Sequence, residues 1–160
     1  MKRWTLRNAG TGALIYASGD SVAAWLSGEF QLTRSIGMLL IGGTLYAIEI
    51  PTYFAWLDRR FGGGAWRARI ERALLAQAFF NPLWIARHLA WIFCVSGRYA
   101  DIGWSLLSVA WTSFVNIAPF AIAVNYLIQN HIPLHWRFLC SALFSAAMAV
   151  YYASSERLFA

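Results

Sequence analysis

The residues with the clearest chemical potential are two carboxylic acids, Asp20 and Glu49, because each lies inside a long apolar stretch. A charged side chain at the centre of a bilayer costs roughly 3 kcal/mol on insertion scales. Acids in such positions therefore normally face a bundle interior, a partner or a water-filled path. They point to a functional interior, but they do not identify a substrate.

Further polar side chains fall at similar depths in the other apolar stretches. Counted from the more basic side at 1.5 Å per residue, Asp20 lies about 16 Å deep, and Glu49 and Asn81 lie about 12 Å deep. Four predicted helices thus bring polar groups to a similar level, which favours a shared polar interior or aqueous path. The candidate lining residues are Asp20, Glu49, Gln77, Asn81, Arg87, His88 and Asn116.

One predicted helix, Ala73–Val95, carries several of these residues. Gln77, Asn81, Trp84 and His88 are spaced i, i+4, i+7 and i+11, which predicts one shared helix face. Arg87 points elsewhere on the same helix. It could pair with a buried acid, Asp20 before Glu49, or extend to the far membrane interface. We take the pairing with Asp20 as the prediction to test.

The composition indicates which structural elements carry these residues. The chain has 160 residues, of which 59% are hydrophobic and 12% are charged, whereas soluble domains carry about 25% charged residues. We expect an all-α, polytopic membrane helix bundle with four to five transmembrane helices, forming a single integral membrane domain over residues 1–160. The fifth span is marginal because Arg137 shortens it. The predicted spans are Ala9–Ser27, Ile36–Leu57, Ala73–Val95, Trp104–Ile128 and Pro133–Ala153.

The net charge of +6 comes from cations between the apolar stretches. This is the positive-inside pattern of membrane proteins and argues against nucleic-acid binding. The connection from Asp58 to Arg72 holds five arginines, and the N-terminal segment holds three cations. We therefore predict that both lie on the cytoplasmic side, in a bacterial inner membrane or an organelle inner membrane.

Catalytic and metal-binding patterns are missing from the sequence. His88, His131 and His135 lack metal-ligand spacing, and Cys94 and Cys140 lie in apolar stretches without a redox or zinc motif. We predict that the protein is not an enzyme and needs no cofactor. The expected partners are membrane lipids and small solutes or ions, and homo-oligomers remain open.

Prolines and small polar residues add two further expectations. Pro51, Pro82 and Pro119 can each kink a helix, because proline lacks a backbone N–H. The fourth predicted span carries a stripe of small or polar residues, which favours close helix packing, with a pore lining as the alternative. The stripe consists of Ser105, Ser108, Thr112, Asn116 and Pro119.

Several short motifs occur in a characteristic order along nearly the whole chain. They are Gly19-Asp20, Tyr53-Phe54, Leu57-Asp58-Arg59, Leu74-Leu75 with Gln77 and Pro82, Pro119 with Asn125-Tyr126, and Pro133-Leu134-His135-Trp136-Arg137. This order resembles the 22-kilodalton peroxisomal membrane protein family, which includes the mitochondrial inner-membrane "Mpv-seventeen" proteins. The chain departs from the family pattern at Ala24, Ala76 and Ile122, and Glu49 is not a family acid. The resemblance implies channel-like passage of small solutes across an organelle-type membrane.

Three functions compete on the sequence alone. The first is a channel-like or pore-like path for small solutes or ions, with Glu49 facing the interior and controlling passage. The second is a structural or assembly factor without transport, in which Asp20 or Glu49 only holds helices together. The third is a membrane-embedded enzyme that uses Asp20, Glu49 or His88 as acid or base, and the missing catalytic spacing disfavours it.

Overall fold

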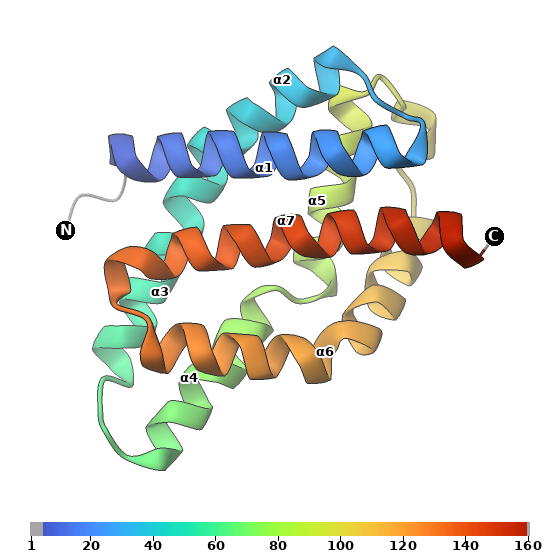
Figure 1. Cartoon of the computed structure of the whole chain (residues 1–160). Coiled ribbons are helices and arrows are strands. Elements are labelled where there is room, and N and C mark those ends of the chain that lie inside the picture. Colours follow the sequence, from blue (N-terminus) through green and yellow to red (C-terminus); the bar gives the residue numbers. More distant parts are fainter. Residues whose placement is uncertain (1–4, 160) are drawn as a thin grey trace. The chain divides into compact units, whose positions relative to one another are not determined.

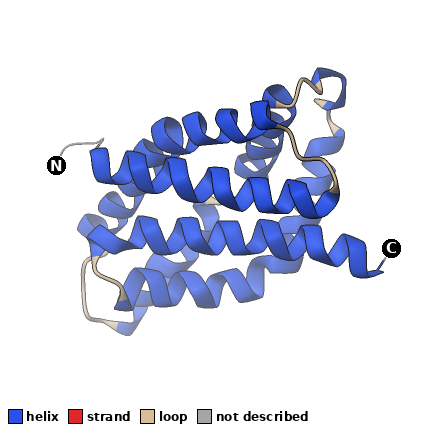
Figure 2. Cartoon of the chain, turned by 45° about the horizontal axis from the view of Figure 1, so that its top comes forward, coloured by secondary structure: helices blue, strands red, loops and turns tan. Residues whose placement is uncertain are grey.

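The computed structural model describes residues 5–159, with side chains described through Tyr151. In this part of the chain every regular element is a helix and no strand occurs (Figures 1 and 2). The predicted all-α class is therefore confirmed. The elements are α1 (Leu6–Ser27), α2 (Leu32–Ile41), the π-helical turn η1 (Gly42–Tyr46), α3 (Ala47–Arg60), α4 (Trp66–Phe79), α5 (Pro82–Val95), the 3₁₀ turn η2 (Tyr99–Asp101), α6 (Ser105–His131) and α7 (Leu134–Phe159).

Three helical segments of the described chain are long and apolar enough to cross a membrane. They are Leu32–Arg60, Trp66–Val95 and Ser105–His131, and they correspond to the second, third and fourth predicted spans. The first and fifth predicted spans are also helical, in α1 and α7, but neither belongs to this set. The protein is thus helical with membrane-compatible segments, and a total of four or five crossings stays a prediction.

Large apolar side chains are exposed along these segments. Val109, Trp111 and Phe120 of α6 are each more than half exposed. Water-soluble monomers rarely expose extended apolar surface, whereas lipid is a favourable environment for it. The exposed side chains therefore fit a membrane location.

The chain divides into two compact units, which we describe separately. One comprises Met1–Thr52 and Phe138–Ala160, and the other comprises Tyr53–Arg137. Helix α3 and helix α7 each contribute residues to both units. Asp20 and Glu49 belong to the first unit, and the other predicted site residues belong to the second.

In the first unit, helix α1 has defined signals at both ends. The hydroxyl of Thr5 accepts a hydrogen bond from the backbone N–H of Asn8, which satisfies one free donor of the first turn. The helix stops at Gly28, whose φ of 78° is readily adopted only by glycine. The resulting turn folds α2 back against α1 (Figure 1).

Glycines let the helices of the first unit approach closely. Gly12 of α1 lies against the backbone carbonyl of Gly42 in η1, and Gly42 in turn lies against the carbonyl of Gly12. Gly19, about two turns further along nearly the same face of α1, lies against Ala146 of α7. Any Cβ at these positions would meet backbone or Cβ atoms, so small residues set the packing here, as is common between membrane helices.

In the second unit, α6 packs against both α4 and α5. The predicted helix Ala73–Val95 is wrong as one continuous element, because it is broken between α4 and α5. Pro82 begins α5, where its missing N–H is not needed, and it cannot continue α4 because its ring would clash with the preceding turn. Asn81 caps α5 by accepting a hydrogen bond from the N–H of Trp84 at 3.0 Å. Pro51 and Pro119, by contrast, lie inside helices that continue past them.

Candidate functional site

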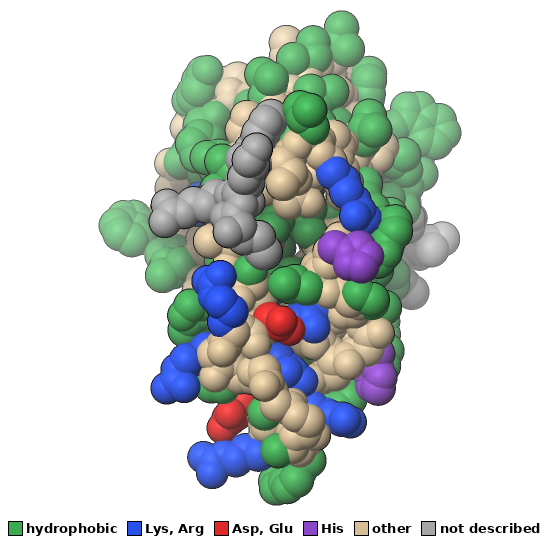
Figure 3. All heavy atoms as spheres, turned by 90° about the vertical axis from the view of Figure 1, so that its left-hand side faces the viewer, with side chains coloured by type: hydrophobic (Ala, Val, Ile, Leu, Met, Phe, Trp, Pro, Cys, Tyr) green, Lys and Arg blue, Asp and Glu red, His purple; other side chains and the backbone are tan. Residues whose placement is uncertain are grey.

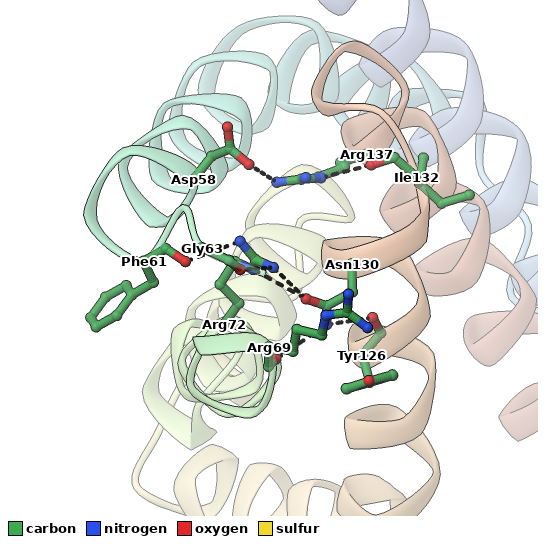
Figure 4. Close-up of polar contacts among 9 residues, drawn as sticks. All are labelled: Asp58, Phe61, Gly63, Arg69, Arg72, Tyr126, Asn130, Ile132 and Arg137. Carbon is green, nitrogen blue, oxygen red and sulfur yellow. Dashed lines mark hydrogen bonds and ion pairs between the residues drawn. The ribbon is translucent and has the colours of Figure 1, made fainter. Parts of the chain in front are cut away.

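At one end of the Tyr53–Arg137 unit, polar groups surround Arg72 of α4 (Figure 4). This arginine is only 8% exposed. Its guanidinium donates to Asn130 Oδ1 at 2.7 and 3.1 Å, and to the backbone carbonyl of Phe61 at 3.0 Å. A longer bond of 3.4 Å reaches the carbonyl of Gly63. Among the described residues no carboxylate pairs with Arg72, so its positive charge is solvated by neutral oxygens.

Asn130 joins this arginine to helix α6. Its Oδ1 atom accepts from Arg72, while its Nδ2 atom donates to the carbonyl of Arg69 at 3.1 Å and to that of Tyr126 at 2.8 Å. Both the oxygen and the nitrogen of the Asn130 amide are therefore hydrogen-bonded. Together, Asn130 and Arg72 connect α6, α4 and the segment between α3 and α4 by side-chain hydrogen bonds (Figure 4).

A second buried arginine lies in the same region. Arg137 donates to Asp58 Oδ1 at 2.8 Å and to the backbone carbonyl of Ile132 at 2.9 Å. Its side chain is 9% exposed, whereas that of Asp58 is 38% exposed. Arg72 and Arg137 together carry two positive charges against the one carboxylate of Asp58, so this end of the unit retains positive charge.

Further along α6, several amide side chains are buried. Gln77 of α4 accepts a hydrogen bond from Nδ2 of Asn125 at 3.0 Å, and both residues are buried. Gln129 follows Asn125 by four residues, so it lies on the same face of α6. Gln129 is fully buried, and within the described chain neither its amide nitrogen nor its amide oxygen has a hydrogen-bond partner.

The predicted face of Gln77, Asn81, Trp84 and His88 is only partly formed. Gln77 lies in the interior of α4, but Asn81 caps α5, so the helix break separates the two residues. Trp84 and His88 do lie on one face of α5, where their rings stack with centroids 5.6 Å apart. Arg87 places its guanidinium carbon 5.9 Å from the centre of the Trp84 ring.

Asn116 does not join the amides of α6, because it is exposed. It precedes Asn125 by nine residues, which is two and a half helical turns, and the two side chains therefore point to opposite faces. Asn116 belongs to the stripe of small and polar residues on α6, and every member of this stripe is exposed. Within the second unit the stripe therefore neither packs against another helix nor lines a pore, the two roles predicted for it. Its members are Ser105, Ser108, Thr112, Asn116 and Pro119.

In the first unit, Asp20 is buried and pairs with Arg34. The guanidinium binds both carboxylate oxygens, at 2.7 and 2.8 Å, and a weaker contact of 3.7 Å joins Arg34 to Glu29. The counter-charge of Asp20 is therefore Arg34 and not Arg87, and a pairing of Arg87 with Glu49 stays a prediction. The short turn after α1 brings Arg34 beside Asp20, so the acid finds its counter-charge locally. Glu49 is half-buried in α3, and its role in passage stays a prediction.

Four interior residues are not among those predicted from the sequence: Arg72, Asn125, Gln129 and Asn130. The sequence predicts Arg72 only as a cation of the connecting loop and Asn125 only as part of a family motif. The i, i+4 spacing of Asn125 and Gln129 was the available signal. The hydrogen bonds of Arg72 to backbone carbonyls depend on tertiary folding, and no residue pattern encodes them.

We compared the chain with known proteins to find a relative with a similar geometry. No protein-family model, no curated protein and no solved structure matches the chain.

Proposed function

We propose that this protein is a small membrane bundle of four to five helices that lets small solutes or ions pass across an inner membrane. The path runs through the polar interior of the Tyr53–Arg137 unit. The observation that carries the proposal is Gln129, which is fully buried about one turn from the Gln77–Asn125 pair. Neither of its amide atoms has a partner among the residues that the structure describes. A buried amide without partners costs about 1–3 kcal/mol, and a passing polar solute can offer both a donor and an acceptor.

The chemistry of this interior favours neutral polar or anionic solutes. Amide groups replace part of a solute's hydration shell without holding it by charge, which suits passage better than tight binding. Arg72 adds a positive charge that no carboxylate of the described residues neutralises, and it lies on the same helix as Gln77. Such a charge attracts anions and opposes cations.

Two sequence features support the same function. The order of motifs resembles a family linked to channel-like passage of small solutes, and three segments have the length and apolarity of membrane spans.

The test is solute flux into liposomes that contain the purified protein. Gln129→Leu removes the unpartnered amide, and we expect it to lower the flux of a small polar solute by at least about 10-fold if each lost hydrogen bond in the path costs ~1.4 kcal/mol. Asn116→Leu is the matched control, since it makes a similar change on the exposed face of the same helix. Equal flux through both variants, or none through the unchanged protein, contradicts the proposal.

Glu49, which belongs to the first unit, provides a second test of passage. A carboxylate that faces a solute path attracts cations and opposes anions, which is the reverse of the preference expected from Arg72. Glu49→Gln keeps the shape and removes the charge, so it should shift the cation/anion preference toward anions. If the unchanged protein conducts and Glu49→Gln leaves this preference as it was, Glu49 serves packing only.

A non-transporting structural or assembly factor is the second candidate. The observation that favours it is the Asp20–Arg34 pair, because an acid whose two oxygens are both held by one guanidinium is a structural element rather than a carrier of ions. Under this alternative, liposomes with the unchanged protein show no flux above empty ones, and Gln129→Leu has no effect on any solute.

A further inference from the structure

The connection between α3 and α4 lies where a membrane surface is expected. It joins two segments that are each long enough to span a bilayer, one ending at Arg60 and the next beginning at Trp66. Trp56 and Trp66 flank it and are 42% and 74% exposed. Tryptophan prefers the level of the lipid head groups, so both neighbours place the connection at that level.

This connection carries more positive charge than its acids can neutralise. Residues 58–72 contain five arginines and two acids, which leaves a net charge of +3. Asp58 is bonded to Arg137, and Glu71 is bonded to Arg67. The other exposed arginines, Arg59, Arg60 and Arg69, have no acidic partner within the described chain. Figure 3 shows cationic side chains gathered over the lower half of the face that looks left in Figure 1, where this connection lies.

The backbone that carries these arginines is held in place from inside. Arg72 bonds the carbonyls of Phe61 and Gly63, and Asn130 bonds the carbonyl of Arg69 (Figure 4). A buried guanidinium therefore fixes the segment from which the exposed ones project. Less conformational freedom is then lost when a ligand binds.

We infer that the connection between α3 and α4 is a binding surface for the phosphate-bearing head groups of anionic lipids. Guanidinium groups bind phosphate oxygens in a planar, two-pronged geometry, and several arginines next to a membrane span attract anionic lipid surfaces. The ligand is a lipid rather than free phosphate, because the arginines lie between two membrane-length segments and beside exposed tryptophans. The inference does not depend on the proposed passage of solutes.

The test uses the full chain in detergent at low salt. Short-chain phosphatidylglycerol, phosphatidylcholine of the same chain length and inorganic phosphate are titrated separately, and tryptophan fluorescence reports binding. We expect phosphatidylglycerol to bind most tightly. The double variant Arg59→Gln/Arg69→Gln should weaken that binding roughly 10- to 30-fold, given ~1 kcal/mol per basic residue near an anionic surface.

A charge-matched control is Arg7→Gln/Arg98→Gln, which removes the same charge outside the connection. It should leave the affinity within about 3-fold. Thermal stability checks that both double variants fold. Equal weakening by the two variants, equally tight binding of phosphatidylcholine, or binding of inorganic phosphate as tight as that of phosphatidylglycerol would each overturn the inference.

Discussion

Arg34 of the first unit and Arg72 of the second hold their positive charges in opposite ways. In the first, Arg34 meets the carboxylate of Asp20 through two hydrogen bonds, and the charges cancel. In the second, Arg72 is buried and is surrounded by an amide oxygen and backbone carbonyls. The first arrangement binds two helices to each other. The second anchors a connecting segment and leaves a positive charge for an external anion.

The difference shows why burial of a charge is not by itself a sign of function. Removing one partner of a neutralised pair is strongly destabilising, because the other charge is then left unpaired in a low-dielectric site. A guanidinium held by neutral dipoles has no such partner to leave behind. Mutations that remove one charge should therefore affect the two units unequally.

The largest effect is expected from Arg34→Leu, which leaves Asp20 buried without its counter-charge. Breaking one side of a buried pair costs about 3–5 kcal/mol. The double variant Asp20→Leu/Arg34→Leu should recover most of that loss, because no unpaired charge remains. The midpoint of thermal unfolding in detergent measures both. A double variant no more stable than Arg34→Leu would show that the pair does more than neutralise charge.

The packing of the first unit gives the next largest effect. Gly42→Ala places a Cβ against the backbone carbonyl of Gly12, which cannot move aside as a side chain would, and a loss of about 1–3 kcal/mol is expected. Gly10→Ala is the control, since its Cβ meets open space in the same helix as Gly12. That change should stabilise the protein by up to about 1 kcal/mol through helix propensity. Equal unfolding midpoints for the two variants would contradict the close helix contact.

A smaller effect is expected from Arg72→Gln in the second unit. The change removes donors from the carbonyls of Phe61 and Gly63, but it also removes the cost of burying a charge. We expect a loss of about 1–2 kcal/mol, well below that of Arg34→Leu. Limited proteolysis at the Gly62–Gly64 segment should become faster at the same time. A loss as large as that of Arg34→Leu would erase the contrast between the two units.

The smallest effect is expected from Asn116→Leu, because this side chain is exposed on α6. A surface change of this kind is usually worth within about 0.5 kcal/mol. Unfolding is compared at two protein concentrations in the same detergent. A larger loss that depends on concentration would mean that Asn116 is packed against a second copy of the chain.

The helices themselves could be predicted because apolar length and end signals are local. The apolar stretches located the long helices, whereas Pro82 was expected only to kink the helix Ala73–Val95 and instead separates α4 from α5. The partners of the polar residues could not be predicted in the same way. Depth along a helix axis suggested that Asn116 and Asp20 share an interior, but depth ignores rotation about the axis, and rotation turns Asn116 outward. Asp20 pairs with Arg34 because the turn after α1 folds α2 back against α1. The depth estimate did not include the geometry of this turn.

The reciprocal contact of Gly12 and Gly42 also constrains how this sequence can change over evolutionary time. Each glycine excludes a side chain from the other's position, because a Cβ at either would meet the other's carbonyl. A second substitution at the partner would add another atom to the same crowded point, so it could not compensate for the first. The two positions are therefore expected to remain glycine together in descendants of this chain, or to be lost together with the close approach of α1 to η1.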